Sequence, residues 1–88
     1  MGAELLPLGP GGVIAVNRVL AIANPDSAPI RRMVRQAREG GVLIDLTRGR
    51  QIKAVVVLDT GHIALAAVEP EAIVSRLESW RGGEVSFV

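Results

Sequence analysis

Residues 53–68 read Lys-Ala-Val-Val-Val-Leu-Asp-Thr-Gly-His-Ile-Ala-Leu-Ala-Ala-Val, and this stretch decides the fold. The run over residues 53–58 is almost continuously apolar, so a strand formed by it presents apolar side chains on both faces and lies inside a sheet. Asp59-Thr60-Gly61 has the composition of a hairpin turn, and residues 62–68 return as a second strand. The stretch therefore predicts an antiparallel hairpin at the centre of the domain.

Two helices are predicted on either side of this hairpin. Asn24-Pro25-Asp26-Ser27 has the composition of a turn that leads into a helix, with Ser27 as the N-cap. Because Gly40-Gly41 ends the apolar periodicity, we predict a helix over Ala28–Glu39. A second helix is predicted after Pro70, over residues 71–80. The apolar stripes of the two helices consist of Ile30, Met33, Val34 and Ala37 in the first and Ile73, Val74 and Leu77 in the second.

Shorter strands complete the expected fold. Residues 5–8, 13–16, 19–23 and 42–45 are rich in Val, Ile and Leu, and we expect 13–16 and 19–23 to form one strand bent at Asn17-Arg18. This pattern predicts an α+β domain with a small, mostly antiparallel sheet of about five strands and two helices. We expect one domain over residues 1–80 and a C-terminal tail over residues 81–88.

The composition excludes several classes of protein. Of the 88 residues, 49% are hydrophobic and nearly all of these are aliphatic, so we expect apolar area on the surface and self-association. The absence of cysteine excludes a disulfide scaffold, a zinc finger and an iron–sulfur site. No secretory signal and no apolar run of membrane-spanning length is visible. We therefore expect a cytoplasmic protein with no metal, no cofactor, no membrane partner and no small-molecule substrate.

The charges are unevenly distributed along the chain. Eight of the ten cations lie between Arg18 and Lys53, against three carboxylates in the same window, whereas the rest of the chain holds two cations and six carboxylates. A focused positive field attracts a polyanion even when the total charge is small. The only large aromatic residues, Trp80 and Phe87, lie in the acidic C-terminal part, so no stacking platform for single-stranded bases is expected. This favours the phosphates of double-stranded DNA as the partner.

The densest basic segment is the predicted turn Thr47-Arg48-Gly49-Arg50, followed by Lys53. Three cations around a glycine form a candidate phosphate contact, and we expect Arg18 to lie nearby at a strand end. The alternative is a solvated turn whose surface ion pairs each contribute at most about 1 kcal/mol.

Four further arginines lie on the first predicted helix. They are most simply a solvated face, although a contact with a neighbouring subunit or with DNA remains open at this stage. These residues are Arg31, Arg32, Arg35 and Arg38.

An enzymatic function is considered and not favoured. Residues 57–61, Val-Leu-Asp-Thr-Gly, have the apolar-apolar-Asp-Thr-Gly form found in aspartic proteases, where two carboxylates share a proton. However, His62 stands where that family has a small residue, and no later apolar pair followed by glycine supplies its supporting loop. We expect no catalysis and a structural role for His62. Asp45 is expected either to pair with Arg48 or Arg50, or to cap the end of its own strand.

Short motifs recur from about Gly9 to Leu77. They are Asn17-Arg18-Val19-Leu20, Pro25-Asp26-Ser27-Ala28-Pro29-Ile30-Arg31-Arg32, Ala37-Arg38-Glu39, Leu43-Ile44-Asp45, Thr47-x-Gly49-Arg50, Ala54-Val55-Val56-Val57 and Val68-x-Pro70-Glu71. Together they resemble the RemA family, small bacterial regulators of extracellular-matrix (biofilm) genes. The resemblance implies a DNA-binding transcriptional regulator that assembles into a homo-oligomeric ring, with a fold similar to the DNA-binding domain of LytTR-type regulators.

The resemblance also implies which residues contact DNA. Family members use an arginine that matches Arg18 and an Arg-Arg pair that matches Arg50 and Gln51, so only half of the pair is basic in this chain. Lys53 stands at a further basic position, and Arg48 is an additional candidate. The competing hypothesis is a structural assembly protein whose arginines serve only subunit packing.

Overall fold

The computed structural model describes residues 5–8 and 12–81, and its centre is the predicted hairpin. Strands β5 (Ala54–Leu58) and β6 (Ile63–Ala66) pair antiparallel, and the Leu58 N–H donates to the His62 carbonyl over 3.0 Å. They are the two inner strands of a four-stranded sheet with the order β3-β5-β6-β4. The prediction that the apolar stretch lies inside a sheet is therefore confirmed.

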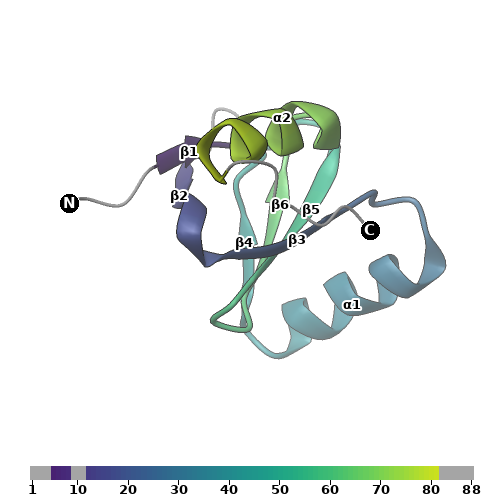
Figure 1. Cartoon of the computed structure of the whole chain (residues 1–88). Coiled ribbons are helices and arrows are strands. Elements are labelled where there is room, and N and C mark those ends of the chain that lie inside the picture. Colours follow the sequence, from purple (N-terminus) through teal and green to yellow (C-terminus); the bar gives the residue numbers. More distant parts are fainter. Residues whose placement is uncertain (1–4, 9–11, 82–88) are drawn as a thin grey trace.

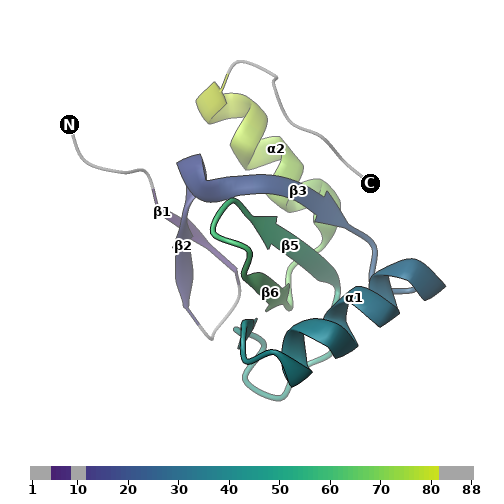
Figure 2. The same cartoon turned by 90° about the horizontal axis from the view of Figure 1, so that it is seen from below.

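Alternate side chains of the inner strands belong to two different cores. Val55 and Leu65 pack with helix α1 (Ala28–Glu39), whereas Val56 and Ala64 pack with helix α2 (Pro70–Arg81). Figure 1 shows α1 below the sheet and α2 above it, and Figure 2 shows the same layers from below. The small ribbon of β1 (Leu5–Pro7) and β2 (Val13–Ala15) adds its buried side chains to the α2 core.

The first helix has the bounds that its sequence predicts. The Ser27 hydroxyl accepts a hydrogen bond from the Ile30 N–H over 3.4 Å, as expected of an N-cap. At the other end Gly41 has a φ of +75°, a conformation that glycine adopts without steric cost. Both signals lie within a few residues of the helix, so they are readable without tertiary information.

The expectation of one sheet of about five strands is wrong, because the described strands form two sheets, one of two strands and one of four. The residues between β2 and β3 (Val19–Ala23) form a 3₁₀ turn, η1 (Val16–Arg18), which separates the predicted bent strand into two, and β1 and β2 form a sheet of their own. Strand β4 (Leu43–Asp45) lies at the edge of the larger sheet and pairs in parallel with β6. The remaining pairings, β1–β2, β3–β5 and β5–β6, are antiparallel as expected.

The second helix begins at Pro70 and extends to Arg81, one residue beyond its predicted end. Residues 82–88 of the expected tail lie outside the described part of the chain. Within that described part, no helix is both long and apolar enough to cross a bilayer.

Large apolar side chains are exposed on one side of the small ribbon and on β3. Leu5, Val13 and Leu20 are 61%, 52% and 60% exposed. In the ribbon Leu6 pairs with Ile14 in the core, so the alternation of the strands directs Leu5 and Val13 to the opposite, outer face. The prediction that a chain this aliphatic leaves apolar area exposed is confirmed.

Candidate nucleic-acid interface

The candidate site begins with the turn over residues 47–50, which we call the basic turn. The Arg50 N–H donates to the Thr47 carbonyl over 3.1 Å, and both central residues have positive φ, +53° at Arg48 and +81° at Gly49. Positive φ at both positions is typical of a type I′ turn, which favours Asn and Gly. Holding an arginine in this conformation costs about 1–2 kcal/mol. Arg48, Gly49 and Arg50 are all exposed.

A buried threonine anchors the basic turn to the sheet. The Asp45 carboxylate accepts hydrogen bonds from the Thr47 N–H over 2.9 Å and from the Thr47 hydroxyl over 2.6 Å, and Thr47 is only 2% exposed. These two bonds, with a smaller contribution from the charge of Arg38, lower the pKa of Asp45 below its usual 3.8. Of the two alternatives for Asp45, the structure shows the strand-end cap.

Arg18 lies at the end of η1 and is held by a carboxylate that the sequence analysis did not assign to it. Its Nη1 is 3.5 Å from Oδ2 of Asp59, and its carbonyl accepts the Asp59 N–H over 2.7 Å. The two side chains are 59% and 36% exposed. An ion pair in such an exposed position contributes about 0.2–1 kcal/mol, so the guanidinium can exchange Asp59 for a phosphate at small cost.

The expectation that Arg18 lies near the basic turn is wrong within one chain. Val19 pairs with Leu58, so Arg18 lies at the end of the sheet that carries the β5–β6 turn. The basic turn follows β4, and the Leu46 N–H donates to the Leu65 carbonyl, which places it at the opposite end. A strand of five residues such as β5 separates its first and last residues by roughly 13 Å.

Lys53 and Gln51 lie at the same end of the sheet as the basic turn, beside acidic residues. Lys53 Nζ is 3.6 Å from Oε2 of Glu69, and both side chains are largely exposed. Gln51 and Lys53 line a polar cleft of about 200 Å³ together with Asp26, Glu69 and Glu71. Three carboxylates around one cation lower the local positive potential, so Lys53 is a weaker candidate for a phosphate contact than the two arginines of the turn.

The residues of the Asp-Thr-Gly motif form a hairpin turn. The Gly61 N–H donates to the Leu58 carbonyl over 3.1 Å, and the Thr60 hydroxyl lies 2.8 Å from Nδ1 of His62. The Asp59 carboxylate faces Arg18 rather than a second acid. Among residues 5–8 and 12–81 there is also no group of three His, Asp or Glu side chains arranged to hold a metal ion.

The first helix carries its arginines exposed, and three of them border a cleft. Arg31, Arg35 and Arg38 lie on one side of a hollow of about 330 Å³ between α1 and the sheet, whereas Arg32 does not line it. The Arg31 Nη1 donates to the Asp26 carbonyl over 2.9 Å. Sequence reasoning identified these arginines but not the cleft, because the cleft depends on how α1 crosses the sheet.

The fold and the basic residues define a small α+β domain whose positive charges are concentrated between Arg18 and Lys53, and several known proteins are similar to it in sequence. A protein of Dehalococcoides mccartyi, ascribed a regulatory role, is 52% identical over 85 residues, which cover 97% of this chain and 88% of the relative. Proteins of Alkaliphilus oremlandii and Synechococcus elongatus, described in the same way, are 51% and 50% identical over 79 and 82 residues. Those alignments cover 90% and 93% of this chain, and 85% and 94% of the respective relatives.

A family model also matches most of the chain. Residues 5–77 match the model of the RemA-like family, described as extracellular matrix regulatory protein A-like. The chain therefore belongs to the RemA-like family, as its motifs indicated, and this family contains proteins to which a regulatory role is ascribed.

Proposed function

We propose that this protein binds double-stranded DNA, with Arg18 and Arg50 as the principal phosphate contacts and Arg48 and Lys53 as auxiliary ones. The observation that supports this most strongly is the conformation of the basic turn. Arg48 occupies a backbone position that favours glycine or asparagine, and such local strain is typical of functional sites. The turn displays two exposed guanidiniums, and neither forms an ion pair with a carboxylate of the described residues.

Self-association supplies the second part of the proposal. Arg18 and the basic turn lie at opposite ends of one sheet, so a single chain offers two separate and weak contacts. In a homo-oligomeric ring, as the family resemblance implies, both contacts repeat around the assembly, and their binding energies add through multivalency. The exposed Leu5, Val13 and Leu20 support self-association, because large apolar side chains left in water on a small domain gain free energy when a second copy covers them.

The target is then selected by the shape of the DNA more than by base edges. Contacts to phosphates fix the position of a protein on a duplex without reading sequence, and a duplex that follows a ring must bend. Gln51, in place of the second arginine of the family pair, carries no charge, so its side chain can offer a phosphate only a neutral hydrogen bond. We propose regulation of extracellular-matrix (biofilm) genes in the cytoplasm, with a LytTR-like mode of DNA contact, on the basis of family membership.

The test is the substitution Arg50→Ala, with Arg76→Ala as the matched control. Arg76 is an exposed arginine on α2, so both variants lose one positive charge from the surface. We expect Arg50→Ala to abolish the gel shift of a bent duplex while the mass of the assembly in native mass spectrometry stays unchanged. Arg76→Ala is expected to bind like the wild type. Equal binding by both variants would remove the basic turn from the mechanism.

The assembly-protein hypothesis remains the second candidate, and one observation favours it. Arg18 and Lys53 already have carboxylate partners, Asp59 and Glu69, so part of the positive charge is compensated within the chain. If the arginines serve packing only, Arg50→Ala would change the mass of the assembly. In that case neither the wild type nor the variant would bind the duplex.

A further inference from the structure

The cleft between α1 and the sheet combines two kinds of surface. Its floor is aliphatic, with Val55 from β5, Leu65 from β6 and Ile52 from the segment before β5. Val34 of α1 and Pro25 extend this surface. Its volume of about 330 Å³ lies in the range of small-molecule sites.

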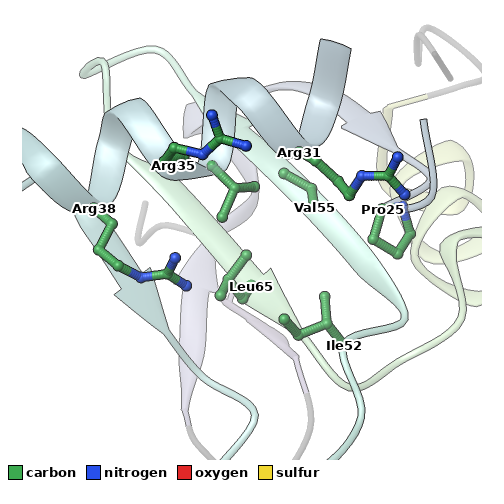
Figure 3. Close-up of a pocket in the computed structure, with 8 residues that line it drawn as sticks. Pro25, Arg31, Arg35, Arg38, Ile52, Val55 and Leu65 are labelled. Carbon is green, nitrogen blue, oxygen red and sulfur yellow. The ribbon is translucent and has the colours of Figure 1, made fainter. Parts of the chain in front are cut away.

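The helix side of the cleft is cationic. Arg31, Arg35 and Arg38 follow one another at steps of four and three residues, so they lie on one face of α1, with successive rises of roughly 6 and 4.5 Å along its axis. Figure 3 shows the three side chains projecting from the helix in different directions around Val55, Leu65 and Ile52, with the guanidinium of Arg31 beside Pro25. Neither ion pair among the described residues involves any of the three arginines. Arg38 is near enough to Asp45 to lower the pKa of that carboxyl, and Arg31 donates to the Asp26 carbonyl, so Arg35 is the arginine of the cleft with the fewest competing contacts.

We propose that this arginine cleft binds a small organic anion with an aliphatic body, such as an alkyl phosphate or a medium-chain carboxylate. The guanidiniums donate paired hydrogen bonds to the anionic group, and the alkyl chain covers Val55, Leu65 and Ile52. A purely polar anion leaves the floor exposed to water, and a neutral alkyl chain leaves the arginines without an acceptor. The ligand must therefore carry an anionic group and an alkyl chain in one molecule. Such a ligand is a small-molecule partner that the sequence did not indicate.

Duplex DNA is a poorer occupant of this site. Its phosphates project from a convex backbone and carry no apolar group to cover a recessed aliphatic floor. A nucleobase is also poorly matched, because none of the lining side chains is aromatic.

A second copy of the chain is the other possible occupant, and the apolar residues argue for a different interface. Among the residues whose exposure is described, the most exposed large apolar side chains, Leu5, Val13 and Leu20, belong to β1, β2 and β3 and not to the lining of the cleft. The surface best suited to association between copies therefore does not include the cleft.

The proposal is tested by titrating octyl phosphate, below its micellar concentration, into the assembled ¹⁵N-labelled protein without DNA. Inorganic phosphate and octyl glucoside serve as controls, since each provides only half of the required chemistry. Octanoate distinguishes a carboxylate ligand from a phosphate. We expect saturable shifts of the amides of α1, β5 and β6 with octyl phosphate or octanoate, at a dissociation constant below about 1 mM, and none with either control.

Two variants connect the binding to the arginines of the cleft. Arg35 lines the cleft, whereas Arg32 is exposed on the same helix and does not. Arg35→Gln is expected to weaken octyl phosphate binding at least about tenfold, and Arg32→Gln to leave it within about twofold. Both substitutions are on the surface, so a preserved amide spectrum will confirm that the variants are folded.

Three results would overturn the proposal. Absence of saturable binding to both anions, or equal loss in the two variants, removes the site. A change in the mass of the ligand-free assembly in Arg35→Gln alone identifies a neighbouring chain as the occupant. These results are independent of DNA binding, so the cleft and the proposed DNA contact fail or stand separately.

Discussion

The ion pair between Arg18 and Asp59 gives the sharpest prediction about DNA binding. If Arg18 contacts a phosphate, it first gives up a carboxylate 3.5 Å away, and Asp59 repels the same phosphate. Asp59→Asn removes this competition and keeps a residue that tolerates the turn. The Asp59 N–H that binds the Arg18 carbonyl is part of the backbone and is retained.

The magnitude follows from the exposure of the pair. Two charges 3.5 Å apart in water interact by about 1.2 kcal/mol, and measured exposed pairs contribute about 0.2–1 kcal/mol. Each Arg18 in contact with DNA therefore gains about 0.2–1 kcal/mol, which is about a 1.4- to 5-fold rise in affinity per contact. In an assembly with several such contacts the factors multiply.

The assay is fluorescence anisotropy of a labelled duplex at fixed salt. Glu78→Gln is the control, since Glu78 is exposed on α2 and forms no described ion pair with a cation, while its loss changes the net charge equally. We expect Asp59→Asn to bind more tightly than Glu78→Gln, and the gain to disappear in the Arg18→Ala background. Equal affinities of the two single variants would show that Arg18 does not contact the duplex.

Three further predictions concern the basic turn. Arg48→Asn is expected to raise the free energy of unfolding by about 0.5–1 kcal/mol, because Asn tolerates positive φ, and to weaken DNA binding; urea unfolding and anisotropy measure the two effects, and unchanged DNA affinity would exclude Arg48 as a contact. Asp45→Ala is expected to lower the free energy of unfolding by about 1–3 kcal/mol at pH 7, because it leaves the buried hydroxyl of Thr47 without its acceptor. Since folding lowers the pKa of Asp45, the part of its contribution that depends on the charged carboxylate is complete above the usual value of 3.8 and is lost as the pH falls below it. The difference in stability between the wild type and Asp45→Ala should therefore become smaller in acid. The logarithm of DNA affinity is expected to fall with the logarithm of salt concentration by about 0.9 per phosphate bound, and the shallower slope expected of Arg50→Ala measures how many phosphates Arg50 neutralises; a flat response of the wild type would contradict binding through phosphates.

The parts of the structure that the sequence predicts are those encoded by neighbouring residues. The helix from Ala28 to Glu39 is bounded by Ser27 and by glycines, and each of these acts on the helix directly. The central hairpin follows from an apolar run and a three-residue turn. The basic turn was likewise predicted as a turn, although its positive φ at Arg48 was not.

The parts that sequence reasoning missed depend on pairings between distant segments. Asp59 lies beside Arg18 only because β3 aligns with β5 across some forty residues, and no local pattern reports that register. The same register places Arg18 and the basic turn at opposite ends of the sheet. The arginine cleft arises where α1 crosses β5 and β6, so its residues are visible in the sequence but their common hollow is not.

The parallel pairing of β4 has a consequence for the order of folding and for local unfolding. Among the described residues β4 is a three-residue edge strand that pairs with β6 alone, and β6 follows it by about twenty residues in the chain. We therefore expect β4 to dock after the β5–β6 hairpin has closed. Edge segments with few backbone bonds are also the first to detach in local fluctuations. The loop that presents Arg48 and Arg50 is tethered directly to this strand through Asp45. We therefore expect amide exchange to be faster at residues 43–50 than at residues 54–58, which would show that the basic turn opens locally more often than the centre of the sheet.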